Sequence, residues 1–207
     1  LMGNLFKRLV GDPALFLAAL VMTSFGIAMI YSAGQVQVPD VVTQGAWLRQ
    51  LLWLLVGLLA FTAVSRIPVP WIEWAANPVY VFSIILLGLT LIIGEGRGTA
   101  TGVKSFIRLG GFGFQPAEIA KIATILWLAR ILSERDSPLI TLRELVKPGA
   151  IVALPLGLVM LQPDLGTALA FVGILFAMLY WAATPVWLLI LVASPVVGLF
   201  LAYDTAL

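Results

Sequence analysis

This chain of 207 residues is 61% hydrophobic and 11% charged, a composition that excludes a soluble domain, in which about a quarter of the residues are charged. The net charge of +2 is too small to hold a phosphate backbone, so we expect no nucleic-acid partner. Cysteine and histidine are absent, which excludes disulfides, thiol or imidazole catalysis, and metal ligation by these side chains.

Seven apolar runs predict seven transmembrane helices, because a hydrocarbon core about 30 Å thick is crossed by about 20 helical residues. Turn signals at 67–70, 77–78 and 184–185 separate several of them. We expect the two shorter runs to extend into their polar flanks; a re-entrant segment is the alternative for either, as a cleaved signal peptide is for the first run. The seven runs are Ala14–Tyr31, Leu48–Val64, Val79–Ile93, Ile119–Leu132, Gly149–Leu161, Leu165–Ala183 and Val186–Ala202. The predicted fold class is therefore an all-α polytopic membrane protein, with residues 1–207 in one integral membrane domain.

The distribution of basic residues predicts a cytoplasmic amino terminus, since basic residues are enriched on the cytoplasmic side. In this orientation residues 94–117 form an extracytoplasmic loop, and residues 133–147 form a solvated cytoplasmic loop with no assigned chemistry. The basic residues placed inside are Lys7, Arg8, Arg66, Arg130, Arg135, Arg143 and Lys147, and those placed outside are Arg49, Arg97, Lys104 and Arg108.

The loop at 94–117 is rich in glycine and holds three cations outside, against the general bias. Lys104 and Arg108 alternate with apolar residues such as Phe106 and Ile107. One interpretation is a flexible linker with solvated cations. The other is an anion site that folds back on the membrane and holds its cations over a lipid headgroup. A P-loop is excluded, because the lysine is one residue too far from the preceding glycine and no strand comes before it.

Two helix starts carry polar residues that a bilayer span does not need. Glu118 follows Gln115-Pro116-Ala117 at the start of one predicted helix, and Lys121 lies three residues later on the same face, where the two can pair. Asp164 follows Gln162-Pro163 at another start on the same side of the membrane. An ordinary helix start, with an acid near the positive end of the dipole, is the alternative at both places.

Ionisable residues within membrane spans are costly and usually functional. We therefore predict that Glu118, Lys121 and Asp164 line one polar cavity at the outer leaflet. We expect Lys121, Lys104 or Arg108 to meet the charge of Asp164, because no basic residue lies near it in sequence.

The segment from Lys104 to Lys121, which ends in Gln-Pro-Ala-Glu-Ile-Ala-Lys, resembles the first signature of the SEDS family (shape, elongation, division and sporulation). Residues 162–168, Gln-Pro-Asp-Leu-Gly-Thr-Ala, resemble its second signature. The resemblance covers the whole chain and is closer to the elongation members of the family than to the division members. There are three departures. Ala117 stands in place of serine; Phe106 stands in place of tryptophan, with Arg108 after rather than before Ile107; and the chain is shorter than the family pattern.

The resemblance implies a peptidoglycan glycosyltransferase that polymerises lipid II into β-1,4 glycan strands at the outer face of the bacterial inner membrane, for cell elongation and rod shape. It implies three partners: lipid II, membrane lipid and a class B penicillin-binding protein that supplies the transpeptidase. Glu118 would be a supporting catalytic residue. No certain cofactor is implied, although Glu118 and Asp164 are candidates to share a divalent cation, Mg²⁺ or Mn²⁺, with the substrate phosphates. Substrate binding is implied for Lys121, Lys104, Arg108, Gln115, Gln162 and Asp164.

Members of the family have about ten spans and an essential aspartate on a loop after the seventh. We therefore expect this chain to be the amino-terminal part of a longer protein and to be inactive alone, and we do not assign that role to Asp204. Two other functions stay open. A lipid II transporter needs a polar path to the cytoplasmic side, which the fourth to sixth spans lack, and a non-catalytic scaffold would only dock the penicillin-binding protein.

Overall fold

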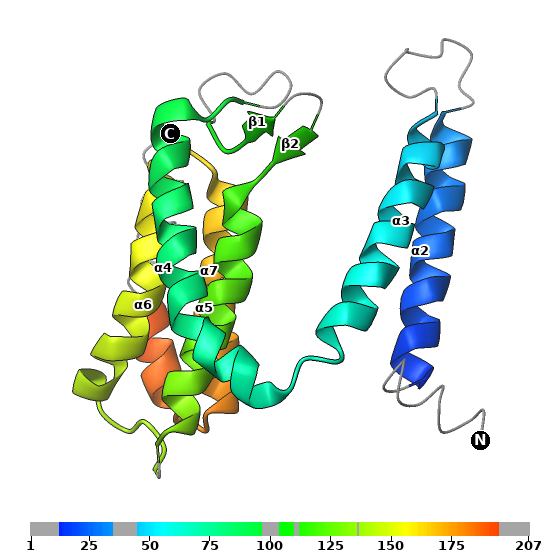
Figure 1. Ribbon diagram of the computed structural model, residues 1–207. Coiled ribbons are helices and arrows are strands. Elements are labelled where there is room, and N and C mark those ends of the chain that lie inside the picture. Colours follow the sequence, from blue (N-terminus) through cyan, green and yellow to red (C-terminus); the bar gives the residue numbers. More distant parts are fainter. Residues whose placement is uncertain (1–12, 35–44, 97–103, 110–111, 136, 195–207) are drawn as a thin grey trace. The chain divides into compact units, whose positions relative to one another are not determined.

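The computed structural model describes residues 13–34, 45–96, 104–109, 112–135 and 137–194 (Figure 1). They fall into two compact units, Leu1–Val69 and Pro70–Leu207. Each unit is described by itself. Helices dominate both, in agreement with the predicted all-α membrane fold, and the exception is one short hairpin in the second unit.

The first unit consists of helices α2 (Pro13–Ala33) and α3 (Ala46–Val64), which pack side by side. Both are long and apolar enough to cross a membrane, and none of their residues in those windows is buried. Gly45 precedes α3 with a φ of +76°, a left-handed conformation that glycine adopts without steric cost. The first two predicted spans are therefore confirmed as helices, with apolar side chains on nearly every face.

The second unit begins at the second residue of α4 (Val69–Ile93), a helix of 25 residues that is also long and apolar enough to cross a membrane. The predicted start at Val79 and the predicted turn at 77–78 are wrong, because the helix runs through Pro78. Proline removes one backbone donor, but membrane helices tolerate this where neighbouring groups compensate. At this end of α4, the Arg130 guanidinium donates to the Glu73 carbonyl at 3.1 Å.

Three further helices complete the described bundle: α5 (Pro116–Ser133), α6 (Leu142–Met160) and α7 (Leu165–Trp181). Residues 186–194 are also helical. The two short predicted runs do extend into polar flanks. Consequently α5 and α6 each carry three charged residues, and the connector between them spans only 134–141 rather than 133–147. Glu144 tightens this connector, because its Oε2 accepts hydrogen bonds from the backbone N–H groups of Ile140 and Thr141, each at 3.0 Å.

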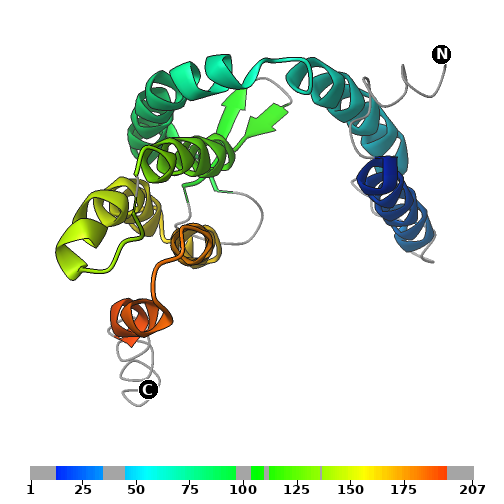
Figure 2. The same ribbon diagram turned by 90° about the horizontal axis from the view of Figure 1, so that it is seen from below.

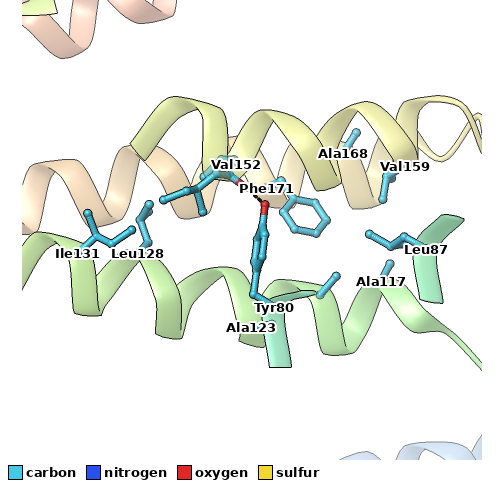
Figure 3. Packing of buried hydrophobic residues seen from close by; sticks show 12 residues of the cluster. Tyr80, Leu87, Ala117, Ala123, Leu128, Ile131, Val152, Val159, Ala168 and Phe171 are labelled. Atoms are coloured by element: carbon cyan, nitrogen blue, oxygen red, sulfur yellow. Dashed lines mark hydrogen bonds between the residues drawn. The ribbon is translucent and has the colours of Figure 1, made fainter. Parts of the chain in front are cut away.

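The core of the second unit forms around α5, which contacts both α6 and α7 and lies between α4 and α6 when the bundle is viewed end on (Figure 2). Buried alanines at 117, 120 and 123 let neighbouring helices approach α5 closely. Figure 3 shows Tyr80 of α4 pointing toward α6 beside Phe171. Its ring lies 4.2 Å from that of Trp127, and its hydroxyl donates to the Ile151 carbonyl at 2.6 Å.

A small antiparallel hairpin precedes α5, formed by β1 (Ile107–Leu109) and β2 (Phe112–Phe114). An isolated bridge between Glu95 and Phe106 joins the end of α4 to this hairpin. The predicted glycine-rich loop therefore contains paired strands, which the sequence analysis did not anticipate. Strand pairing satisfies the backbone groups of this segment.

Candidate functional site

The starts of α5 and α7 meet at the end of the second unit that carries the hairpin, here called the hairpin end (Figure 1). Asp164 caps α7: its carboxylate accepts from the Thr167 backbone N–H at 3.0 Å and from the Thr167 hydroxyl at 2.8 Å. Gln115 precedes the first residue of α5, and its Nε2 donates to Asp164 Oδ2 at 3.3 Å. This hydrogen bond joins two signatures that are 49 residues apart in the chain.

Glu118 and Lys121 form the ion pair that their spacing predicts, with 2.8 Å between Oε1 and Nζ. Lys121 is the more covered partner, since 25% of its side chain is exposed against 57% for Glu118. Glu118 is three residues beyond Gln115, so the ion pair continues from the contact with Asp164 along the first turns of α5. The hairpin end thus gathers two carboxylates, one amide and one ammonium group.

The expected cationic partner of Asp164 is not found among the described residues, where its carboxylate forms no ion pair. Neutral donors, two on Thr167 and one on Gln115, meet the charge instead. Hydrogen bonds at a helix start stabilise a carboxylate without a basic neighbour, because the dipole and the free N–H groups favour negative charge there. Lys121 therefore remains paired with Glu118 in this structure.

Gln162 lies differently from the other predicted site residues. Only 1% of its surface is exposed, and its Nε2 donates to the Leu87 carbonyl of α4 at 3.2 Å. In this structure its side chain connects the turn before α7 to α4 through this hydrogen bond. A contact with substrate would require this bond to open, so the substrate-binding role of Gln162 stays a prediction.

The cations of the hairpin are exposed and differ in their partners. Arg108 pairs with Glu95 at 3.2 Å, an acid that the sequence analysis did not single out. The sequence does contain a feature that could have identified Glu95 as a partner of Arg108: it is the one acid in the glycine-rich segment before the signature. Lys104 is exposed, and its carbonyl lies close to Gly94. Arg97 and Asp204 lie outside the described residues.

The two candidate metal ligands are already engaged. Glu118 binds Lys121, and Asp164 accepts three hydrogen bonds. Within the described ranges, no three acidic side chains gather into a group that could hold a metal ion. A divalent cation shared by Glu118, Asp164 and the substrate phosphates therefore stays a prediction, and no step below depends on one.

The family model described as "Cell cycle protein", which covers FtsW, RodA and SpoVE, matches residues 13–205. The chain belongs to this family, the SEDS family of the sequence analysis. FtsW of Trichlorobacter lovleyi is 37% identical over 183 residues, which are 86% of this chain and 48% of the relative. RodA of Treponema pallidum is 35% identical over 185 residues, 89% of this chain and 42% of the relative. The chain therefore spans about half the length of these curated relatives, and their identities do not separate RodA from FtsW.

Two solved structures share the fold. A crystal structure of a mutant of the rod shape determining protein RodA from Thermus thermophilus gives a TM-score of 0.76 at 29% identity, covering 91% of this chain and 59% of that one. A structure of a peptidoglycan synthase complex gives a TM-score of 0.64 at 27% identity, covering 90% and 52%. Together with the apolar helices, these similarities make the chain part of a polytopic integral membrane protein.

Proposed function

We propose that this chain forms the amino-terminal part of a peptidoglycan glycosyltransferase that polymerises lipid II at the outer face of the bacterial inner membrane. The observation that carries the proposal is the hydrogen bond between Gln115 and Asp164, because it brings both signatures to one site at the hairpin end. RodA of Treponema pallidum is named a peptidoglycan glycosyltransferase, which supports the same activity.

The chemistry suits the residues present. In lipid II polymerisation the 4-hydroxyl of an acceptor sugar attacks the anomeric carbon of a donor sugar, the bond from that carbon to the undecaprenyl pyrophosphate breaks, and a base takes the hydroxyl proton. The leaving group carries the charge that most needs stabilisation, and preorganised cations supply it. We assign that role to Lys121, with Lys104 and Arg108 as further cations. Glu118 holds the Lys121 ammonium at 2.8 Å and is its positioning residue.

The elongation role and the partner are finer parts of the same proposal. The sequence resembles the elongation members of the family more than the division members, so we assign the protein to cell elongation and rod shape. The similar structure of a peptidoglycan synthase complex supports a class B penicillin-binding protein as the partner that crosslinks the strands. Lipid II serves as both donor and acceptor.

Glycan polymer made from purified lipid II by the full-length protein, resolved on a gel, tests the proposal. Lys121→Ala should remove most of the polymer, because it deletes the ammonium group that we assign to the leaving pyrophosphate, and Glu118→Ala should reduce it. Ile122→Ala is the matched control, since Ile122 is the next residue of α5 and 59% exposed. It should keep wild-type activity.

Wild-type polymer from both Glu118→Ala and Lys121→Ala would refute the assignment. A parallel assay for movement of fluorescent lipid II across vesicles separates the transporter alternative. Translocation that Lys121→Ala abolishes, with no polymer from the wild type, would favour a transporter. Neither polymer nor translocation from the wild-type protein would favour a scaffold. In that case cell shape should stay intact in Glu118→Ala and Lys121→Ala and be lost on substitutions in a partner-facing span.

A further inference from the structure

The second unit has a groove at the end opposite the hairpin, where α5 is joined to α6. Its volume is about 490 Å³, and residues of α4, α5 and α6 line it. The wall is apolar and includes Tyr80, Trp127, Val146, Ala150 and Leu154. The basic residues Arg143 and Lys147 also line it, in the first turns of α6.

The length of the groove matches one leaflet of a bilayer. Its lining on α6 runs from Arg143 to Leu154, and 11 residues of helix rise about 16 Å. The hydrocarbon core of a bilayer is about 30 Å thick, so one leaflet is about half of that. Val146 and Leu154 are exposed by 66% and 50%, as expected for side chains that face acyl chains.

The two cations of the groove lack the partners that neighbouring cations have. Arg130 pairs with Glu134 at 3.2 Å, and Arg135 pairs with Glu144 at 2.7 Å. Neither Arg143 nor Lys147 forms an ion pair within the part of the chain that the structure describes. They are four residues apart, so they lie on one face of α6.

Arg143 and Lys147 lie near the start of α6, where an unpaired cation is unfavourable. The start of a helix is the positive end of its dipole, where a cation is unfavourable and an anion is favourable. Arg143 lies in the first turn of α6 and Lys147 in the next turn, beside the apolar groove. Glu144 is the acid in the first turn of α6, but its carboxylate is engaged by Arg135 and by the backbone of residues 140 and 141. An anion at the mouth of the groove would offset the two unpaired cations.

We propose that this groove binds an anionic phospholipid, with its phosphate on Arg143 and Lys147 and one acyl chain along Val146, Ala150 and Leu154. The shared chemistry is a phosphate joined to an alkyl chain, and basic pockets between membrane helices bind such headgroups. The site is separate from the proposed polymerase site, because α5 runs from the hairpin end at Pro116 to the opposite end at Ser133. The proposal does not depend on the activity of that site.

Native mass spectrometry of the detergent-purified full chain tests the proposal by titration with phosphatidylglycerol, phosphatidylcholine or inorganic phosphate. The double variant R143Q/K147Q should bind the first phosphatidylglycerol about 30-fold more weakly, the fold-change that corresponds to about 1 kcal/mol per cation. Both side chains are exposed, so the fold should persist. Its affinity for phosphatidylcholine should not change, and neither should any lipid affinity of the control R66Q, which removes an exposed cation after α3.

A second variant tests the groove without changing charge. Ala150→Phe places a ring in the path of the acyl chain and should weaken phosphatidylglycerol binding about tenfold, as expected for about two displaced methylenes at ~0.8 kcal/mol each. Unchanged phosphatidylglycerol affinity in R143Q/K147Q would overturn the proposal. So would competition by inorganic phosphate at equal concentration, which indicates a simple anion site, or displacement of the lipid by a partner's transmembrane helix, which indicates a protein-docking groove.

Discussion

The hydroxyl of Tyr80 compensates for a proline in the middle of α6. In an α-helix the carbonyl of Ile151 would accept from the backbone N–H of residue 155, but residue 155 is proline and has no N–H. Tyr80 donates to this carbonyl at 2.6 Å and is only 3% exposed. We therefore predict that Tyr80→Phe leaves a buried carbonyl unpaired.

The structure sets the size of this effect. An unpaired buried acceptor costs about 1–3 kcal/mol, and hydrogen bonds between membrane helices average about 0.6 kcal/mol, so we expect Tyr80→Phe to lower the free energy of unfolding by about 1–2 kcal/mol. Pro155→Ala supplies the missing N–H. In that background Tyr80→Phe should cost less than about 0.5 kcal/mol, which leaves a coupling of about 1 kcal/mol between the two positions.

Reversible unfolding in mixed detergent micelles, followed by near-ultraviolet circular dichroism, measures the stability of the wild type, the two single variants and the double variant. Tyr180→Phe is the matched control, because Tyr180 is 61% exposed on α7, and its cost should stay below about 0.5 kcal/mol. The reasoning would be refuted if Tyr80→Phe lowered the free energy of unfolding equally in the wild-type and Pro155→Ala backgrounds. The hydroxyl would then act through its packing alone.

Three further predictions concern the ends of the helices. Gly94→Ala should lower the free energy of unfolding by about 1–3 kcal/mol in the same assay. A Cβ at this position would collide with the Thr90 carbonyl and lie 2.8 Å from the carbonyl of residue 104. An unchanged free energy of unfolding would mean that the segment shifts freely. Asp164→Ala removes the cap of α7 and should lower the free energy of unfolding by about 1 kcal/mol. Thr167→Val keeps the backbone donor and should lower it by less. A larger loss of stability in Thr167→Val than in Asp164→Ala would contradict the capping geometry. Hydrogen bonds from the Thr141 side chain and from the backbone of residues 140 and 141, aided by Arg135, lower the pKa of Glu144 below its ordinary 4.5. Its contribution to stability is therefore full above that value and lost as the pH falls through the lowered pKa, so the thermal midpoint should fall less on acidification in Glu144→Gln than in the wild type.

Local spacing was enough to predict one half of the candidate site. Proline at the start of α5, with Glu118 and Lys121 three residues apart, predicts both the helix start and the ion pair that the structure contains. These features depend only on helix geometry. The contact between Gln115 and Asp164 depends on how α5 and α7 pack, so the sequence could place both residues on one side of the membrane but not choose the donor that meets the carboxylate.

The error in the predicted start of α4 has a physical cause. Local rules predict a helix boundary at the proline of 77–78, yet α4 continues through Pro78. Inside a packed membrane bundle a side chain or backbone group from a neighbouring helix can compensate for the missing donor, as Tyr80 does for Pro155. Such compensation comes from residues 71 positions away in the chain, which local sequence rules do not include.

Photocrosslinking tests the central claim most directly. A lipid II analogue with a photoreactive group next to its pyrophosphate, added to the full-length protein in membranes, would be mapped by mass spectrometry of the labelled peptides. The account predicts label on peptides that contain residues 104–121 and 162–167, with the yield reduced by Lys121→Ala. Label confined to the opposite end of α5, around Arg130, or distributed without regard to Lys121, would contradict it.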